Sequence, residues 1–449
     1  MKISSILGLN ARTQLYTYKY NSPGGKNIAN SKIQTARVLR RAGIAKPKIY
    51  KKFLTATDVS EFDWSTLPNR FALKPSRGLG GEGIIVIKKR LMNKQLIKSS
   101  NEPIWINTNK ERVTVEDLKL QTLDILEGAY SMGNVPDVAF IQEYVGRHER
   151  FRRLAYRGTP DIRIIVFNKV PVMAMLRLPT KESGGRANLH QGAIGVGIDM
   201  ATGITTKAIW HGAQIVFKPG TERKLRGIKI PNWTTMLTIA VRAQEASTLG
   251  YIGVDMVLHP EKGPMVLELN AQPGLQIQMA NMEGLKRRLE RVEDLDVMDA
   301  EHGVKIAKAL FAGRFVDRSR LDEGIKTIKA VEEIEVLAGE GHHPKYPRVL
   351  AKIDTGAWSS AIDEKFAREI GIYSKRQVLW KRKKLSALGE EQRAVIPMTF
   401  WLAGRKINTN VTVADRSELR YQVLIGRVDL TGFLISAEID KDKLKEAKW

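Results

Sequence analysis

Two apolar segments in the second half of the 449-residue chain carry acidic and amide side chains. Asp255 lies in Gly-Val-Asp-Met-Val, whereas Glu268 and Asn270 lie in Val-Leu-Glu-Leu-Asn. Burying a carboxylate among such residues is costly unless it is paired or bound to a metal ion, and strand residues two apart share a face. Two carboxylates and an amide oxygen form a hard oxygen set suited to Mg²⁺, or to Mn²⁺ in its place. A buried ion pair or a set of strand-end caps is the alternative interpretation.

A glycine-rich loop lies between two short apolar segments, 71–75 and 84–87, and contains Gly78, Gly80, Gly81 and Gly83. Glycines let the backbone bend and bring its N–H groups close to an anion. The loop lacks the Gly-Lys-Ser/Thr of a Walker motif and does not open a helix as a dinucleotide-binding fingerprint does. We therefore expect a flap between two strands that folds over phosphates, with Lys74 neutralising them. A flexible hairpin without a ligand is the alternative.

A third group of polar residues lies between these two motifs: Asp161, Arg163, Arg177, Arg186, Asn188 and His190. Asp161 and Arg163 alternate inside an apolar segment, and Arg177 ends the next one. Guanidinium and amide groups gathered in this way can hold anionic oxygens, and arginine can do so bidentately. The alternative for His190 is an ordinary half-buried histidine.

The hydrophobic pattern predicts an α+β protein with two main parts. In the first part we expect helices at 28–43, 116–130 and 233–249, and a mostly helical stretch at 284–312. Strands are expected at 71–75, 84–87, 138–145, 161–168, 170–178, 193–199, 213–217, 251–258 and 264–270. Apolar density falls at 317–329, which we interpret as a linker. A mostly-β domain of residues 330–449 follows, with strands at 330–337, 348–353, 394–403, 406–413 and 422–425.

The chain is strongly basic, with a net charge of +25, and residues 1–60 carry twelve basic side chains against one acid, Asp58. Such a surface attracts polyanions: nucleic acid, nucleotides or acidic peptides. The chain has no cysteine, which excludes a disulfide or a cysteine nucleophile and fits a reducing compartment. No apolar run is long enough to span a membrane, and the apolar stub at the N-terminus is too short for a signal peptide. We therefore expect a cytoplasmic protein with no membrane partner.

Taken together, the motifs of the first part resemble the ATP-grasp superfamily of carboxylate–amine ligases, and most closely the RimK-like alpha-L-glutamate ligases. The resemblance covers about residues 28–312 of a ligase domain that we expect at residues 28–316, after an N-terminal extension of residues 1–27. Its motifs occur in the family's order: a helix carrying Lys32, a turn from Gly43 to Pro47, Lys74 with the glycine loop, residues 141–145, 161–163 and 186–190, Asp255, and Glu268 and Asn270 with Asn-x-x-Pro-Gly.

The resemblance implies roles for individual residues. The implied ATP site consists of Lys32, Lys74, Gly78, Gly80, Gly81, Gly83, Gln142, Glu143, Tyr144, Val145 and Asp161. Within it the two lysines would contact phosphates, the backbone of 142–145 would hold the adenine edge, and Glu143 or a nearby acid would hold the ribose. Mg²⁺ would be bound by Asp255, Glu268 and Asn270. Phosphate and an acyl intermediate would be bound by Arg163, Arg177, Arg186 and Asn188.

The implied reaction joins an amino-acid donor, such as glutamate, to a peptide or protein carboxylate through an acyl phosphate. Family members usually carry a further α/β domain of about a hundred residues before the ATP-binding core, and here only some thirty residues precede Lys32. We therefore expect an acceptor site that is open to a peptide or protein terminus, or that is completed by another chain. The alternatives are a dipeptide or biosynthetic peptide ligase, and a nucleic-acid-binding or scaffold protein with a vestigial ATP site. The basic residues show little of the aromatic interleaving that stacks bases.

The second part contains Lys-Ile-Asp-Thr-Gly-Ala around Asp354, then Asp415-Arg416-Ser417 and Leu-Ile-Gly-Arg ending at Arg427. It resembles the retropepsin-like fold, and specifically the RimB-like ATP-dependent zinc proteases. Aspartic proteases use two aspartates that share a proton, so a single Asp-Thr-Gly requires a homodimer. The alternative for Asp354 is a structural turn in an inactive domain that binds peptide. We do not expect zinc, because HExxH and cysteine are absent and a loop pair such as His342-His343 is more often solvated than ligating.

Overall fold

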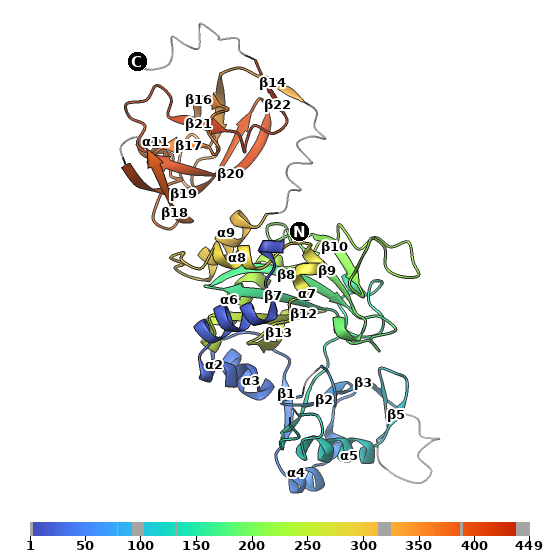
Figure 1. Ribbon diagram of the computed structural model, residues 1–449. Coiled ribbons are helices and arrows are strands. Elements are labelled where there is room, and N and C mark those ends of the chain that lie inside the picture. The colour runs from blue at the N-terminus through green and yellow to red at the C-terminus, as the bar shows by residue number, and fades with distance from the viewer. Residues whose placement is uncertain are drawn as a thin grey trace. The chain divides into compact units, whose positions relative to one another are not determined.

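The computed structural model describes residues 3–78, 80–91, 103–131, 133–312, 325–386 and 389–436 (Figure 1). The chain divides into two compact units, Met1–Asp294 and Leu295–Trp449. Helix α9 (Ala300–Leu310), expected within the first domain, belongs to the second unit, because His302 Nε2 lies 2.8 Å from the Val378 carbonyl and Asn410 donates to the Ala309 carbonyl. The expected linker falls largely outside the described residues. No helix in the described ranges is long and apolar enough to cross a membrane.

The first unit contains a six-stranded antiparallel sheet. Its order is β1 (Ile49–Phe53), β6 (Ala139–Glu143), β2 (Phe71–Pro75), β3 (Ile85–Arg90), β4 (Trp105–Asn107) and β5 (Arg112–Val113). Helices α4 (Ala56–Glu61) and α5 (Val115–Leu126) pack against it, and each begins with a capping box, which satisfies two otherwise unpaired amides. The buried core between these elements contains Phe53, Trp64, Phe71, Trp105 and Leu118.

A seven-stranded antiparallel sheet forms the rest of the first unit. Its order is β11 (Ala213–Ile215), β10 (Thr205–Trp210), β9 (Ile194–Ile198), β8 (Val170–Leu178), β7 (Asp161–Phe167), β12 (Tyr251–His259) and β13 (Gly263–Asn270). Helix α6 (Trp233–Ser247) packs on β7, β8 and β12, and α7 (Gln276–Asn281) packs on β8, β9 and β10; α8 (Lys286–Glu290) follows. Every residue of β8 is buried, so the middle of the sheet is covered on both faces.

The N-terminal segment is more helical than expected. A helical stretch covers α1 (Leu9–Ala11) and a π-helical turn, Arg12–Tyr18. Two helices, α2 (Pro23–Ala29) and α3 (Lys32–Arg41), replace the single helix expected at 28–43. The Ser22 side chain accepts from the Gly25 amide and Pro23 occupies the first helical position, an arrangement that starts a helix.

The second unit contains a closed six-stranded barrel. The strands follow the order β15 (Val331–Val336), β16 (Arg348–Asp354), β21 (Val423–Gly426), β17 (Ala361–Asp363), β20 (Arg405–Ala414) and β19 (Gly389–Leu402), and β19 pairs again with β15. Strand β18 (Trp380–Ser386) pairs with β19 outside the barrel. Helix α11 (Glu364–Glu369) follows β17, and β14 (Lys326–Ile328) pairs with β22 (Phe433–Ile435). Closure leaves the barrel strands without a free edge.

Candidate active site

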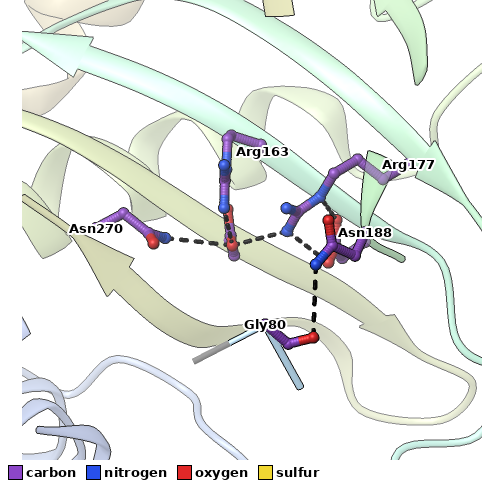
Figure 2. Close-up of polar contacts among 7 residues, drawn as sticks. Gly80, Arg163, Arg177, Asn188 and Asn270 are labelled. Atoms are coloured by element: carbon purple, nitrogen blue, oxygen red, sulfur yellow. Dashed lines mark hydrogen bonds and ion pairs between the residues drawn. The ribbon is translucent and has the colours of Figure 1, made fainter. Parts of the chain in front are cut away.

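A buried network of carboxylates and arginines lies across β7, β8 and β12 of the first unit (Figure 2). Strand register sets it, because Asp255 is paired with Arg163 and Asp161 is paired with Arg177. Arg163 binds Asp255 bidentately, with Nε–Oδ1 and Nη2–Oδ2 distances of 2.7 and 2.6 Å. Arg177 binds Asp161 bidentately, and its Nη2 also lies 2.7 Å from Asp255 Oδ2. Asn270 Nδ2 donates to the same Asp255 oxygen at 3.2 Å.

The two aspartates of this network differ in acidity. Burial disfavours the charged form of both. Against that effect, Arg163 and Arg177 together hold the pKa of Asp255 below its ordinary value. Burial and the neighbouring Asp255 charge raise the pKa of Asp161 to about 7, although Arg177 opposes the rise. Asp255 is therefore the permanent anion that orients the two guanidinium groups.

Three lysines gather opposite Glu268. Lys32 Nζ donates to the Gly78 carbonyl at 2.8 Å, Lys74 Nζ donates to Gln142 Oε1 at 2.9 Å, and Lys46 Nζ donates to the Leu267 carbonyl at 2.5 Å. Because these lysines lie close together, neighbouring charges add to the effect of burial on the pKa values of Lys46 and Lys74. Burial, then Lys74 and Lys32, lower the pKa of Lys46 to about 7 while Glu268 opposes. Burial and Lys32 lower the pKa of Lys74 to about 8, again against Glu268. Clustered cations of this kind are stabilised by a polyanion.

The glycine loop approaches the residues that follow β8. Asn188 Nδ2 lies 3.5 Å from the Gly80 carbonyl (Figure 2), and a side chain at Gly81 would begin 3.6 Å from Arg186 Cδ. A hydrogen bond holds the backbone at the start of the loop, since the Arg77 amide donates to Asp137 Oδ2 at 2.7 Å. Gly83 has φ +68° and a Cβ there would lie 2.5 Å from Tyr130 Cγ, so only glycine fits this position.

The expected adenine segment, residues 142–145, begins within β6 and continues past its end at Glu143. Gln142 connects Lys74 to the turn after α3, because its Oε1 accepts from Lys74 and its Nε2 donates to the Pro47 carbonyl at 3.4 Å. Glu143 accepts from Lys262 and from the Lys48 amide. These bonds hold the pKa of Glu143 below its ordinary value against burial. Tyr144 and Val145 continue the segment, and Thr159 Oγ1 donates to the Val145 carbonyl at 2.7 Å.

The oxygen donors at the end of β13 fit a hard cation. Glu268 is opposite Asp255 in the strand register, and Asn270 uses only its Nδ2 within the described residues, which leaves its amide oxygen free. Both oxygens of Asp255 accept from arginine, so a metal ion bound there would share them. Within the described ranges no group of three His, Asp or Glu side chains is arranged as a metal site. Asp255, Glu268 and Asn270 as metal ligands therefore all stay predictions.

The structure brings most of the predicted site residues into one region, and adds others. Lys46 completes the lysine cluster, Asp137 anchors the glycine loop, and Lys262 pairs with Glu143. Lys46 lies inside the Gly43–Pro47 turn that the sequence already singled out, so the position was found but the side chain's role was not. His190 is exposed, not half-buried as in the alternative interpretation, and its amide donates to Asn188 Oδ1.

Asp354 lies in the second unit, where it ends β16 beside Gly426 of β21. Its Oδ1 accepts from the Gly356 and Ala357 amides at 2.9 and 3.1 Å, the expected tight turn. Below it, the buried Ser360 hydroxyl donates to Asp429 and accepts from the Gly426 amide. The Asp354 side chain is 27% exposed, and its Oδ2 lies 3.9 Å from Lys352 Nζ.

Comparison with known proteins identifies the first unit. A family model described as "Sugar-transfer associated ATP-grasp" matches residues 11–294, a range that contains both sheets and the lysine and arginine clusters. The class of protein expected from the motifs is thereby confirmed as ATP-grasp. The chain belongs to the sugar-transfer associated ATP-grasp family. The match begins at residue 11, so the segment expected as an N-terminal extension lies mostly within it.

Solved structures that the chain matches include the ATP-grasp ligase PsnB complexed with a minimal precursor, at 16% identity, a TM-score of 0.32 and coverage of 61% of this chain and 63% of that chain. D-Alanine–D-alanine ligase from Bacillus anthracis complexed with ATP matches at 14% identity and a TM-score of 0.32, with coverage of 68% of this chain and 71% of that chain. Simian foamy virus protease matches at 21% identity and a TM-score of 0.17, with coverage of 22% of this chain and 90% of that chain. The chain thus spans about 63% of the length of PsnB. No curated protein matches the chain significantly.

Proposed function

We propose that the first unit is an ATP-dependent carboxylate–amine ligase that forms an amide through an acyl phosphate. The observation that carries this proposal is the arrangement of opposite charges: a lysine cluster under the glycine loop lies next to Glu268, and Glu268 is opposite the arginine-bound Asp255. The lysine cluster suits a polyphosphate, and the arginines bound to Asp255 suit the carboxylate that receives its terminal phosphoryl group.

The chain's own groups divide the chemistry between them. Lys32, Lys46 and Lys74 neutralise the phosphates, and the glycine loop covers them and excludes water. Arg163 and Arg177, fixed by Asp255, stabilise the negative charge that builds on the transferring phosphoryl group. A divalent cation held by Glu268 and Asn270, with Asp255 nearby, would neutralise charge between the phosphates.

The proposed reaction balances in two steps. A carboxylate oxygen of the acceptor attacks the γ-phosphorus, the bond to the β-phosphate oxygen breaks, and an acyl phosphate and ADP form. The donor amine then attacks the acyl carbon, phosphate leaves with the oxygen that came from the carboxylate, and the ammonium proton is released. Glutamate is the first donor to offer, and an acidic peptide or protein carboxylate is the first acceptor.

The test is ADP release from ATP and Mg²⁺, with single amino acids and short acidic peptides offered in pairs. Glu268→Ala removes a predicted metal donor, and Lys88→Ala on the exposed part of β3 is the matched control. We expect amino-acid-dependent ADP that disappears in Glu268→Ala and persists in Lys88→Ala, with an amide product by mass. Substrate-independent turnover, or equal turnover in both variants, would contradict the ligase.

Two other functions are distinguished in the same assay. A dipeptide or biosynthetic peptide ligase would accept a free amino acid as acceptor, and the product mass would show it. The family description, sugar-transfer associated, makes a sugar carboxylate the next acceptor to offer. A nucleic-acid-binding or scaffold protein with a vestigial site would bind RNA with a steep salt dependence and release no ADP with any pair.

For the second unit we propose peptide binding or hydrolysis at Asp354. Two copies would be needed to form an aspartate dyad, so hydrolysis requires a homodimer. The support is the partly exposed carboxylate held by two backbone amides near the buried Ser360–Asp429 pair. Asp354→Asn should abolish cleavage of the ligase product if the unit is a peptidase, whereas unchanged peptide binding without any cleavage would leave only the binding function.

A further inference from the structure

A hollow runs along the outer side of β1, between α3 and the chain that leads into the six-stranded sheet. Its volume is about 960 Å³. One wall is formed by successive turns of α3 and the other by residues 43–52, with this lining: Ile33, Ala36, Arg37, Arg40, Gly43, Ile44, Ala45, Lys46, Pro47, Lys48, Ile49, Tyr50, Lys51 and Lys52. We call it the β1 groove. Figure 1 shows α3 and β1 near one another in the first unit.

The β1 groove is cationic and its charges are largely uncompensated. Its lining contains two arginines and four lysines and no acidic residue. Among the described residues, the side chains of Arg37, Arg40, Lys48 and Lys52 form no ion pair. Like charges held close together repel one another, so this cluster is stabilised when an anionic partner fills the groove. The surrounding sequence, residues 1–60, has only Asp58 to offset twelve basic side chains.

The groove also exposes a sheet edge. Strand β1 is the first strand of the six-stranded sheet and pairs with β6 on one side only. The Lys48 carbonyl accepts from the Glu143 amide of β6. Because successive residues of an antiparallel strand direct their backbone groups to alternate sides, Ile49, which precedes the register shift between Ile49 and Lys51, directs its N–H and carbonyl away from β6. An unpaired edge is a template for an added strand.

We propose that the β1 groove binds an acidic peptide in an extended conformation, which pairs with the free edge of β1 and places its carboxylates among the basic side chains. Apolar groups of Ile33, Ala36 and Ile44 line the groove as well, which suits the alternating side chains of a strand. A nucleic acid fits less well, because Tyr50 is the only aromatic residue of the lining and Lys48 Nζ lies 5.8 Å from its ring centroid. Stacking of bases needs open aromatic faces.

The groove leads to the candidate active site through Lys46. This lysine lines the groove, and its Nζ donates to the Leu267 carbonyl, next to Glu268. A peptide held along β1 would therefore have a section close to the phosphate-binding lysines. The role of this peptide as the acceptor substrate rests on the proposed ligase function. Peptide binding itself requires no ATP and is measured separately.

The experiment measures binding of a fluorescent peptide of alternating glutamate and valine to the full chain without ATP. Arg37→Gln/Arg40→Gln removes two groove charges, and Lys88→Gln/Lys89→Gln removes the same charge from the exposed part of β3. We expect dissociation constants about tenfold higher for the first pair and nearly unchanged for the second. A second groove pair, Lys48→Gln/Lys52→Gln, lies outside α3 and should weaken binding in the same way, which distinguishes loss of charge from a folding defect in α3. Thermal unfolding of each variant is recorded.

Backbone pairing is read from amide hydrogen exchange. Peptide binding should slow exchange at least severalfold at the β1 amides that face away from β6, beginning with Ile49, while a matched glutamine–valine peptide should neither bind nor protect. Equal weakening in the groove and control pairs, or absent protection at β1, would overturn the proposal. Tighter binding of a single-stranded RNA that displaces the peptide would assign the groove to nucleic acid instead. ADP release that fails while the peptide still binds would refute the ligase and leave the groove intact.

Discussion

The lysine cluster predicts that ATP binding takes up protons. Without a ligand, burial and neighbouring cations lower the pKa of Lys46 to about 7 and of Lys74 to about 8. The tetraanionic triphosphate supplies the missing counter-charge, so both amines should be fully protonated in the complex. At pH 8 Lys46 would then gain about 0.9 proton and Lys74 about 0.5, which gives an uptake of about 1.4 protons per ATP.

The same linkage fixes the pH dependence of affinity. Between pH 7 and 8.5, above the range in which phosphate itself titrates, the dissociation constant for ATP should rise about 60-fold. In the ligand-free protein the stability of the fold changes with pH in the opposite direction to the affinity for ATP. Both folded-state pKa values are lower than in the unfolded chain, so these lysines destabilise the fold at pH 7 and cease to do so as the pH rises toward 10.

Isothermal titration calorimetry in two buffers of different ionisation enthalpy measures the uptake. Lys46→Gln should reduce it at pH 8 to about 0.5 proton. Lys74→Gln should reduce it to below about 0.9 proton, because loss of the Lys74 charge also raises the pKa of Lys46. Lys88→Gln on the exposed part of β3 is the control and should leave it unchanged. An uptake near zero, with affinity independent of pH, would refute the reasoning that these lysines meet the phosphates.

Three further predictions follow from single contacts. Gly83→Ala should destabilise the protein by about 1 to 3 kcal/mol more than Gly133→Ala, because both have positive φ but only Gly83 would clash, with Tyr130; thermal unfolding measures it, and equal costs would contradict the clash. Arg177→Lys cannot bind Asp161 bidentately and reach Asp255 as well, so kcat should fall at least about tenfold while the KM for ATP changes little; an unchanged kcat would remove Arg177 from the chemistry. Ser360→Ala removes a buried hydrogen bond to Asp429 and should cost about 1 to 3 kcal/mol of unfolding free energy, whereas Ser359→Ala should cost little; denaturant titration distinguishes them, and similar losses would show that the pair is not structural.

Much of the fold was readable from the sequence, because long apolar runs with clear boundaries leave few options. The nine residues of β8 coincide with the predicted strand 170–178, and β12 and β13 lie within a residue of prediction. The barrel strands β15, β16 and β21 were also found. Their β-branched residues and turn signals decide the local structure.

The misses have local physical causes. Ser22-Pro23-Gly24-Gly25 was interpreted as a turn from its glycine and proline content, yet Ser22 caps a helix that tolerates both glycines. Strand β10 (Thr205–Trp210) was not predicted; it is a partner of β9 that includes Thr206 and Lys207, and its short polar and apolar mixture gives a weak periodic signal.

The site was predicted as a set of residue types, but not as a set of contacts. The sequence shows that Asp161, Arg163 and Asp255 are polar residues in apolar strands; it does not show that strand register pairs Asp255 with Arg163 and Asp161 with Arg177. Register depends on packing and turn geometry rather than on composition. The role of Lys46 likewise depends on which strand the turn after α3 meets, and in the structure it meets β13.

The most direct test of the central claim follows the oxygen of the acceptor carboxylate. With an acceptor labelled with ¹⁸O in its carboxylate, the proposed acyl phosphate transfers one labelled oxygen to the released phosphate, which mass spectrometry detects. The account predicts one ¹⁸O per phosphate for each amide formed, dependent on ATP and lost in Glu268→Ala. Amide formation with unlabelled phosphate, or label appearing in AMP, would contradict it.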